Sequence, residues 1–140
     1  MPQQSTKALI ERYYDAFNRA DASGMLACLA ENVHHDVNQG GGRVGKQLFG
    51  EFCAHMARCY KERLTEIVIM VSEGGKRAAA EFVVHGEYMA TDEGLPKAAG
   101  QRYVLPAGTF FEIENGLISR VTTYYNLTDW MRQVTGKAAK

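Results

Sequence analysis

Apolar residues recur every three or four positions in three segments of the first sixty residues, as on one face of a helix. The spacing predicts a helix over residues 6–19, a short helix capped by Asp21, and a third helix over about residues 46–60. The apolar positions are Leu9, Ile10, Tyr13, Ala16 and Phe17 in the first, Met25, Leu26 and Leu29 in the second, and Leu48, Phe49, Phe52, Met56 and Tyr60 in the third.

The remaining residues form a strand pattern. Four runs are predicted as strands, over residues 64–73, 78–88, 102–114 and 117–127, and a tail over 128–134 as a helical turn. Gly74-Gly75 and Asn115-Gly116 are hairpin turns, whereas residues 89–100 form a polar loop. The order predicts an α+β domain over residues 1–140, in which a curved antiparallel or mixed sheet wraps on the N-terminal helices as a cone with a pocket.

A polar stripe interrupts this pattern between the second and third helices. On a strand, His34, Asp36 and Asn38 share one face, and Val33, His35 and Val37 share the other. An unpaired buried polar group costs about 1–3 kcal/mol, so such a stripe suits a solvent-filled crease better than a dry core. We therefore expect the first face to line the pocket. The alternative is that Asp36 orders the glycine-rich turn that follows.

The amino-acid composition limits the kinds of partner that the chain is expected to bind. Sixteen lysine and arginine residues balance sixteen aspartates and glutamates with no basic stripe, which argues against nucleic acid and anionic membrane as partners. No apolar run approaches the ~20 residues of a membrane span, and the N-terminus lacks the apolar region of a signal peptide. Cys28, Cys53 and Cys59 form no CxxC pair, so free thiols and a cytoplasmic location are expected. A neutral chain also tends to self-associate.

Two motifs are weighed against simpler explanations. Gly40-x-Gly42-x-x-Gly45 has the spacing of a dinucleotide fingerprint, but the strand before it is too polar and no βαβ unit follows, so we interpret it as a turn. His34 with Asp36, and His55 with Cys59, each offer two metal ligands, one short of a convincing site. No cofactor and no metal are therefore predicted.

Several stretches resemble the SnoaL-like branch of the nuclear transport factor 2-like (NTF2-like) superfamily, and within it the ketosteroid isomerase-related proteins. They are Arg12-Tyr13-Tyr14-Asp15-Ala16-Phe17-Asn18-Arg19-Ala20-Asp21, His34-His35-Asp36, Arg43-Val44-Gly45, Gly100 to Gly108, Asn115 to Val121 and Tyr124 to Trp130. The resemblance implies the cone-shaped NTF2-like (cystatin-like) fold, commonly a homodimer, with a pocket for a small hydrophobic molecule. The superfamily also hosts carriers and dimerisation modules.

The resemblance implies roles for individual residues. The family's oxyanion tyrosine corresponds to Tyr13, and its carboxylate base to Asp36 when the alignment is anchored on Gly45. An alignment anchored on Asp21 instead places Val37 at the position of the carboxylate base. The family's protonated aspartic acid donor corresponds to Gly108, which has no side chain, so a replacement donor would come from His34, Tyr88 or Tyr103. Related polyketide cyclases use a carboxylate on the last strand, where this chain has Tyr124-Tyr125-Asn126.

These observations lead to one expected function and two alternatives. We expect a small-molecule isomerase or cyclase with Asp36 as general base, Tyr13 as oxyanion donor and His34 assisting. The alternatives are a non-catalytic binder of a hydrophobic molecule, and a protein–protein module whose exposed sheet face carries Val33 and Val37. The expected pocket residues are Asn38, Phe52, Met56, Tyr88, Tyr103, Gly108 and Asn126.

Overall fold

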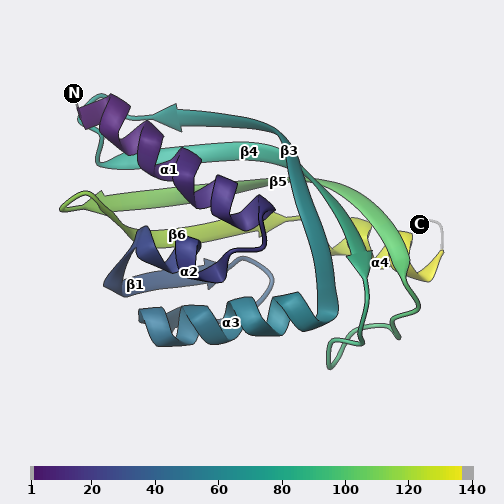
Figure 1. Cartoon of the computed structure of the whole chain (residues 1–140). Helices are drawn as coiled ribbons and strands as arrows, with labels where there is room; N and C mark the ends of the chain where they lie inside the picture. Colours follow the sequence, from purple (N-terminus) through teal and green to yellow (C-terminus); the bar gives the residue numbers. More distant parts are fainter. Residues whose placement is uncertain (1, 137–140) are drawn as a thin grey trace.

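A six-stranded mixed sheet wraps around three N-terminal helices in the computed structural model, which describes residues 2–136 (Figure 1). The strand order is β2-β1-β6-β5-β4-β3, so the last four strands form the predicted antiparallel meander. The elements are α1 (Pro2–Asn18), α2 (Ala22–Ala27), β1 (Leu29–Val37), β2 (Gly42–Val44), α3 (Lys46–Cys59), β3 (Tyr60–Val71), β4 (Arg77–Tyr88), β5 (Gln101–Glu114), β6 (Leu117–Tyr125) and α4 (Leu127–Thr135).

The α+β prediction is confirmed, with differences in several elements. Strand β3 begins at Tyr60, directly after α3, rather than at Leu64, because Tyr60 already has extended backbone angles. The short strand β2 was not predicted; it pairs with β1 across the glycine-rich turn. A positive φ at Glu66 accompanies a register shift in β3, so the side chains that point inward change from even to odd numbers there.

The two ends of the sheet are closed differently. At one end the hairpins turn tightly, with positive φ at Gly75 and at both Asn115 and Gly116, as Asn-Gly turns require. At the other end residues 89–100 make a longer excursion between β4 and β5 (Figure 1). Strand β1 joins the sheet parallel to β6, so it lies beside the last strand of the meander.

The core lies between the helices and the concave face of the sheet. Helix α1 packs its apolar face there through Leu9 and Ile10, which are 3% and 0% exposed. Tyr14 contacts the rings of Phe82 and Phe111 on β4 and β5. Because strand side chains alternate, the in-register row His35, Val121, Phe111 and Ala78 points to this concave face across four strands.

The convex face of the sheet exposes apolar side chains. Phe110 on β5 and Tyr124 on β6 form an edge-to-face pair with ring centroids 5.5 Å apart, and each is more than 40% exposed. Val104 of β5 is also exposed, as are Val68 and Met70 of β3. Val33 is fully buried and Val37 is partly buried, so the expectation that they mark an exposed face is wrong.

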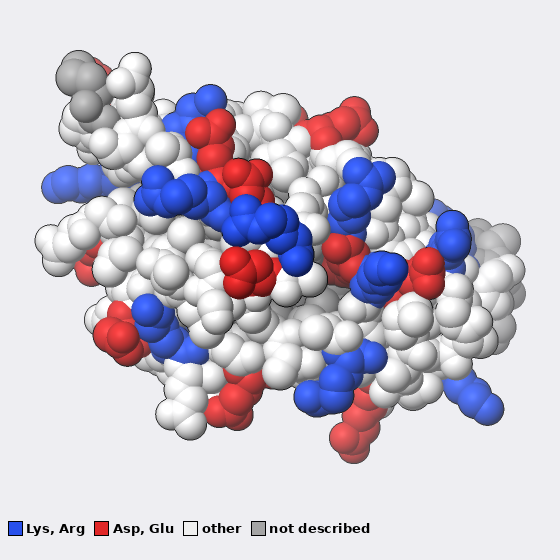
Figure 2. Space-filling view, in the orientation of Figure 1, with Lys and Arg blue, Asp and Glu red and all other residues white. Residues whose placement is uncertain are grey.

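Charges on the surface are mixed in sign. Figure 2 shows lysine and arginine interspersed with aspartate and glutamate over the visible face, in agreement with the balanced composition. Within residues 2–136, none of the helices is both long and apolar enough to cross a membrane.

Candidate functional site

The polar stripe of β1 lies outside the cone. His34, Asp36 and Asn38 share one face of the strand, as predicted, but all three are exposed. The Asp36 carboxylate lies against Gly42 of β2, where a Cβ would overlap it. In the sheet Asp36 pairs with Thr122, which pairs with the exposed Phe110, so this row points to the convex side. The expectation that His34, Asp36 and Asn38 line the pocket is therefore wrong.

The opposite face of β1 brings His35 into the interior instead. Its ring packs against Phe49 and Phe52 of α3, with centroids 4.6 Å away in both cases. Arg43 of β2 donates to His35 Nδ1 at 2.7 Å and stacks over the Phe52 ring at 4.5 Å. Burial, reinforced by the Arg43 charge, lowers the pKa of His35 to about 4. His35 is therefore neutral at physiological pH, with its proton on Nε2.

Tyr13 lies in the core on the concave side, away from Asp36. It makes edge-to-face contacts with Tyr14 and Phe111 at 5.2 and 5.8 Å. Burial raises the pKa of Tyr13, so its hydroxyl stays protonated. Because Asp36 faces the convex side, the sheet separates the two groups, and the expected pairing of a base and an oxyanion donor does not form.

Gly108 and Asn126 were also expected in the pocket, but both lie outside it. Gly108 alternates with the buried Thr109 and shares the convex side with Phe110, so any side chain there would point out of the cone. Asn126 is exposed and caps α4, because its Oδ1 accepts from Asp129 N at 3.0 Å. Neither residue lines the interior, and the assignments of both as pocket residues are wrong.

A carboxylate and a tyrosine meet on the concave face, toward the end of the sheet where residues 89–100 connect β4 and β5. Glu62 of β3, Gly86 of β4 and Tyr103 of β5 are in register across three strands. Tyr103 lies across Gly86, where a Cβ would overlap its ring and hydroxyl, and donates to Glu62 Oε2 at 2.5 Å. The glycine thus lets a side chain on β5 reach a carboxylate two strands away.

Burial perturbs both members of this pair. It raises the pKa of Glu62, although the hydrogen bond from Tyr103 opposes the shift. It also raises the pKa of Tyr103, with the Glu62 charge adding to the effect. A carboxylate with a raised pKa beside a tyrosine that stays protonated is suited to transfer protons.

Aromatic side chains surround the pair. Tyr60 and Tyr88 stack at 5.4 Å, and Trp130 of α4 packs edge-on against Tyr88 at 5.0 Å and against Tyr103 at 6.0 Å. Tyr125 at the end of β6 is partly buried, and its raised pKa comes from burial with the Glu62 charge next in size. The structure therefore places a desolvated carboxylate in an aromatic environment, as binding of a flat apolar molecule would need.

The remaining expected pocket residues are all at least partly buried, but they differ in what their side chains contact. Phe52 and Met56 are partly buried on α3, and Phe52 packs on the interior His35. Tyr88 is fully buried, and its hydroxyl holds the 89–100 loop by donating to Pro96 O at 2.6 Å and accepting from Asp92 N at 2.9 Å. Tyr88 is thus occupied with the loop, and Tyr103, the other interior tyrosine among the three replacements considered, gives its hydroxyl proton to Glu62.

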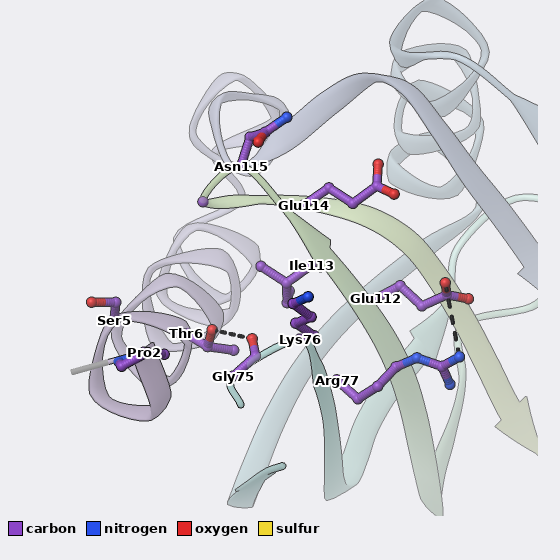
Figure 3. A pocket seen from close by; sticks show the side chains of 11 residues that line it. Pro2, Ser5, Thr6, Gly75, Lys76, Arg77, Glu112, Ile113, Glu114 and Asn115 are labelled. Atoms are coloured by element: carbon purple, nitrogen blue, oxygen red, sulfur yellow. Dashed lines mark hydrogen bonds and ion pairs between the residues drawn. The ribbon is translucent and has the colours of Figure 1, made fainter. Parts of the chain in front are cut away.

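A surface groove of about 750 Å³ lies at the opposite, tight-turn end of the sheet (Figure 3). It is bounded by the start of α1 and by the two hairpin turns, and Thr6 donates to Gly75 O there at 2.6 Å. Arg77 and Glu112 approach to 4.0 Å on its wall. Its lining contains none of the expected site residues, and Arg77 and Glu112 on its wall pair with each other, so we do not take it as the candidate site.

Glu62, Gly86 and Tyr125 are the site residues that sequence reasoning missed. Residues 61–63 lay between a helix predicted to end at Tyr60 and a strand predicted to start at Leu64. In a strand that begins at Tyr60, the side chain of Glu62 points to the same side as that of Leu64, so a carboxylate takes an inward position. Gly86 interrupts the apolar face of β4, and an isolated strand glycine signals close approach by another group.

Comparison with solved structures finds many that match nearly the whole chain, among them two that are each of a "putative polyketide cyclase". The one from Xanthomonas campestris pv. campestris is 50% identical, with a TM-score of 0.93, covering 96% of this chain and 99% of that chain. The one from Silicibacter sp. TM1040 is 60% identical, with a TM-score of 0.91, covering 94% and 96%.

More distant structures share the fold. An NTF2-like protein from Burkholderia pseudomallei is 20% identical, with a TM-score of 0.80, covering 94% of this chain and 98% of that chain. A search of curated proteins finds no match. The sequence profile of the SnoaL-like domain matches residues 10–121, most of the chain. This protein therefore belongs to the SnoaL-like domain family and has an NTF2-like fold.

Proposed function

We propose that this protein is an isomerase or cyclase acting on a small, flat, largely apolar molecule that carries a carbonyl group. The observation that carries the proposal is the Glu62–Tyr103 hydrogen bond inside the cone, made across Gly86. The two similar proteins described as polyketide cyclases support the same class of reaction. Glu62 replaces Asp36 as the proposed general base, because Asp36 faces away from the interior.

The proposed reaction begins with proton transfer to Glu62. The carboxylate takes a proton from the carbon next to the substrate carbonyl, and the C–H electron pair moves to the carbonyl oxygen as an enolate. Tyr103 holds Glu62 Oε2, which leaves Oε1 to receive the proton. Isomerisation follows when Glu62 returns the proton to another carbon. In a cyclisation the enolate carbon attacks a second carbonyl, and the resulting alkoxide takes the proton.

Tyr125 is the proposed donor to the enolate oxygen. It lies on the concave face at the end of β6, and burial with the nearby Glu62 charge keeps it protonated by raising its pKa. Its hydroxyl makes no hydrogen bond to another described residue, so it can donate to a substrate oxygen. Loss of one such donor typically slows a reaction by about 10²–10³-fold.

We also propose that two copies associate through the convex face of the sheet. The exposed rings of Phe110 and Tyr124 pair edge to face on β5 and β6, Val104 is exposed farther along β5, and a second copy would cover these side chains. The balanced charge of the chain adds no net repulsion between copies. This surface is on the other side of the sheet from Glu62, so association would leave the proposed active site open.

The proposal is tested with equilenin, a flat phenol that mimics a dienolate, and with proton exchange. Equilenin fluorescence reports binding, and NMR in D₂O reports exchange at the α-carbon of a β,γ-unsaturated steroid ketone. Glu62→Gln should retain equilenin binding but slow exchange by about 10²–10⁴-fold, since the base is lost. Tyr125→Phe should weaken equilenin binding, since a donor to the phenolate oxygen is lost.

Asp36→Asn is the matched control, because it makes the same carboxylate-to-amide change on the convex face. It should leave both binding and exchange unchanged. Loss of exchange in Asp36→Asn but not in Glu62→Gln would contradict the assignment. Equilenin binding without exchange in the wild-type protein would favour the non-catalytic binder instead.

A further inference from the structure

We propose that His55, Cys59 and Asp92 form a binding site for a Zn²⁺-type divalent ion at the rim of the cone. His55 and Cys59 lie one turn apart on α3, and Asp92 comes from the 89–100 loop. One potential ligand atom from each residue lies within 4.8 Å of the other two. Imidazole nitrogen, thiolate sulfur and carboxylate oxygen are the three ligand types that zinc uses in proteins.

A neighbouring side chain fixes the orientation of one of these ligands. Tyr60 donates to Asp92 Oδ2 at 2.7 Å, and the other carboxylate oxygen, Oδ1, lies 2.9 Å from His55 Nε2. Metal sites are usually supported in this way, by a partner that holds the unligated atom of a ligand. Arg58 donates to His55 Nδ1 at 3.4 Å, so this contact breaks when Nε2 binds the ion and the His55 proton moves to Nδ1.

A zinc ion fits with small movements. Ligand distances of about 2.0–2.3 Å place neighbouring ligand atoms of a tetrahedral site roughly 3.3–3.7 Å apart, so the farthest pair closes by about 1 Å. His55 binds the ion through Nε2 with its proton on Nδ1, and the ion takes the place of the proton on Cys59 Sγ. Binding therefore releases a proton to solvent. Three protein ligands leave the fourth position for water or a substrate oxygen.

A simpler explanation accounts for part of this geometry. The His55–Asp92 hydrogen bond would by itself hold the loop against α3, together with the bond from Met89 N to Cys59 O at 2.7 Å. That explanation gives no role to the Cys59 thiol. A metal site requires the thiolate, so Cys59 distinguishes the two.

The experiment is a titration of the full-length protein with Co²⁺, followed by displacement with Zn²⁺. The proposal expects saturation at one ion per chain, an absorption band from thiolate-to-cobalt charge transfer, tetrahedral cobalt bands, and proton release measured in weakly buffered solution. Cys59→Ser should abolish the charge-transfer band. Asp92→Asn should weaken Zn²⁺ binding tenfold or more while keeping that band.

Cys53→Ser is the control, because Cys53 is a partly buried thiol on the same helix outside the cluster. It should bind cobalt as the wild-type protein does. Absence of stoichiometric binding to the wild type, or an unchanged charge-transfer band in Cys59→Ser, would overturn the proposal. If Cys59→Ser fails to fold, Asp92→Asn tests the proposal by itself. An unchanged Zn²⁺ affinity in that variant would also contradict the metal site. Neither readout depends on the proposed role of Glu62.

Discussion

Asp36 of β1 and Glu62 of β3 are both carboxylates on strands, but the sheet turns them to opposite sides. Asp36 of β1 is exposed on the convex face, beside Gly42. Glu62 of β3 points into the cone and accepts a hydrogen bond from Tyr103. The neighbour of Asp36, His35, takes the inward position on β1. The pKa values of Glu62 and His35 are shifted because both side chains point to the concave face, where the fold removes them from water.

The difference also shows which residues can be exchanged without consequence. A substitution on the convex face alters groups that already contact solvent. A substitution on the concave face alters a hydrogen bond or a desolvated charge that the fold has enclosed. The predictions that follow compare inward positions with matched outward ones.

The largest expected effect is the acid sensitivity that His35 confers. Its pKa is about 4 in the native state, below its ordinary value of 6.5, so the unfolded chain binds a proton that the folded chain excludes. Stability from this group is complete above pH 6.5 and falls as the pH drops toward 4, by on the order of 3 kcal/mol in total. His35→Asn should flatten this dependence, measured as urea-unfolding free energy between pH 7 and pH 4.

His34→Asn is the control for that experiment, because it changes the exposed histidine next to His35 on the same strand. It keeps His35 and should therefore keep the loss of stability on acidification that His35 causes. His35→Asn also loses ring packing against Phe49 and Phe52, so its stability at pH 7 should be lower. Equal pH dependence in His35→Asn and the wild type would contradict the buried, neutral state of His35.

The next largest effect is expected for Gly86→Ala. A methyl group at this position overlaps the Tyr103 ring, so Tyr103 must move and its bond to Glu62 is lost. Overpacking of this kind costs about 1–3 kcal/mol in the free energy of unfolding. Thermal and urea unfolding measure the cost, and equilenin fluorescence measures the change in the site.

Gly108→Ala provides the comparison on the convex side of the adjacent strand. A Cβ there meets only Ala80 O at 3.5 Å, which is ordinary van der Waals contact. Stability and equilenin binding should stay close to those of the wild type. A larger loss in Gly108→Ala than in Gly86→Ala would show that Tyr103 does not depend on the glycine.

The smallest effect is expected for Glu62→Gln. Because the pKa of Glu62 is raised in the folded state, its stabilising contribution is complete below its ordinary value of 4.5 and is lost as the pH rises through the raised value. The glutamine variant avoids this loss. Its stability relative to the wild type should therefore increase between pH 4.5 and pH 8, measured by urea unfolding.

Asp36→Asn makes the same chemical change at the exposed position. It should alter the unfolding free energy by less than about 0.5 kcal/mol at pH 7. A relative stability of Glu62→Gln that falls with rising pH would show that Glu62 is stabilised as a carboxylate, and would contradict its proposed role as a base with a raised pKa.

Much of the fold could be predicted because its signals are local. The helices follow from apolar residues at helical spacing, and the meander follows from turn residues such as Asn115-Gly116. Alternation on β1 was also predicted correctly, with His34 and Asp36 on one face and His35 on the other. Which of those faces is inside was predicted wrongly, because alternation gives two faces without naming the buried one.

The candidate site depended on contacts that no local pattern records. Tyr103 was expected in the interior, but its partner Glu62 lies 41 positions away and meets it only through the register of β3, β4 and β5. Asp92 likewise reaches His55 from 37 positions away. The sequence by itself determined the helices, the hairpins and the family. Strand pairing and sheet curvature decided which polar groups leave water, because desolvation depends on what covers a side chain and not on its neighbours in the chain.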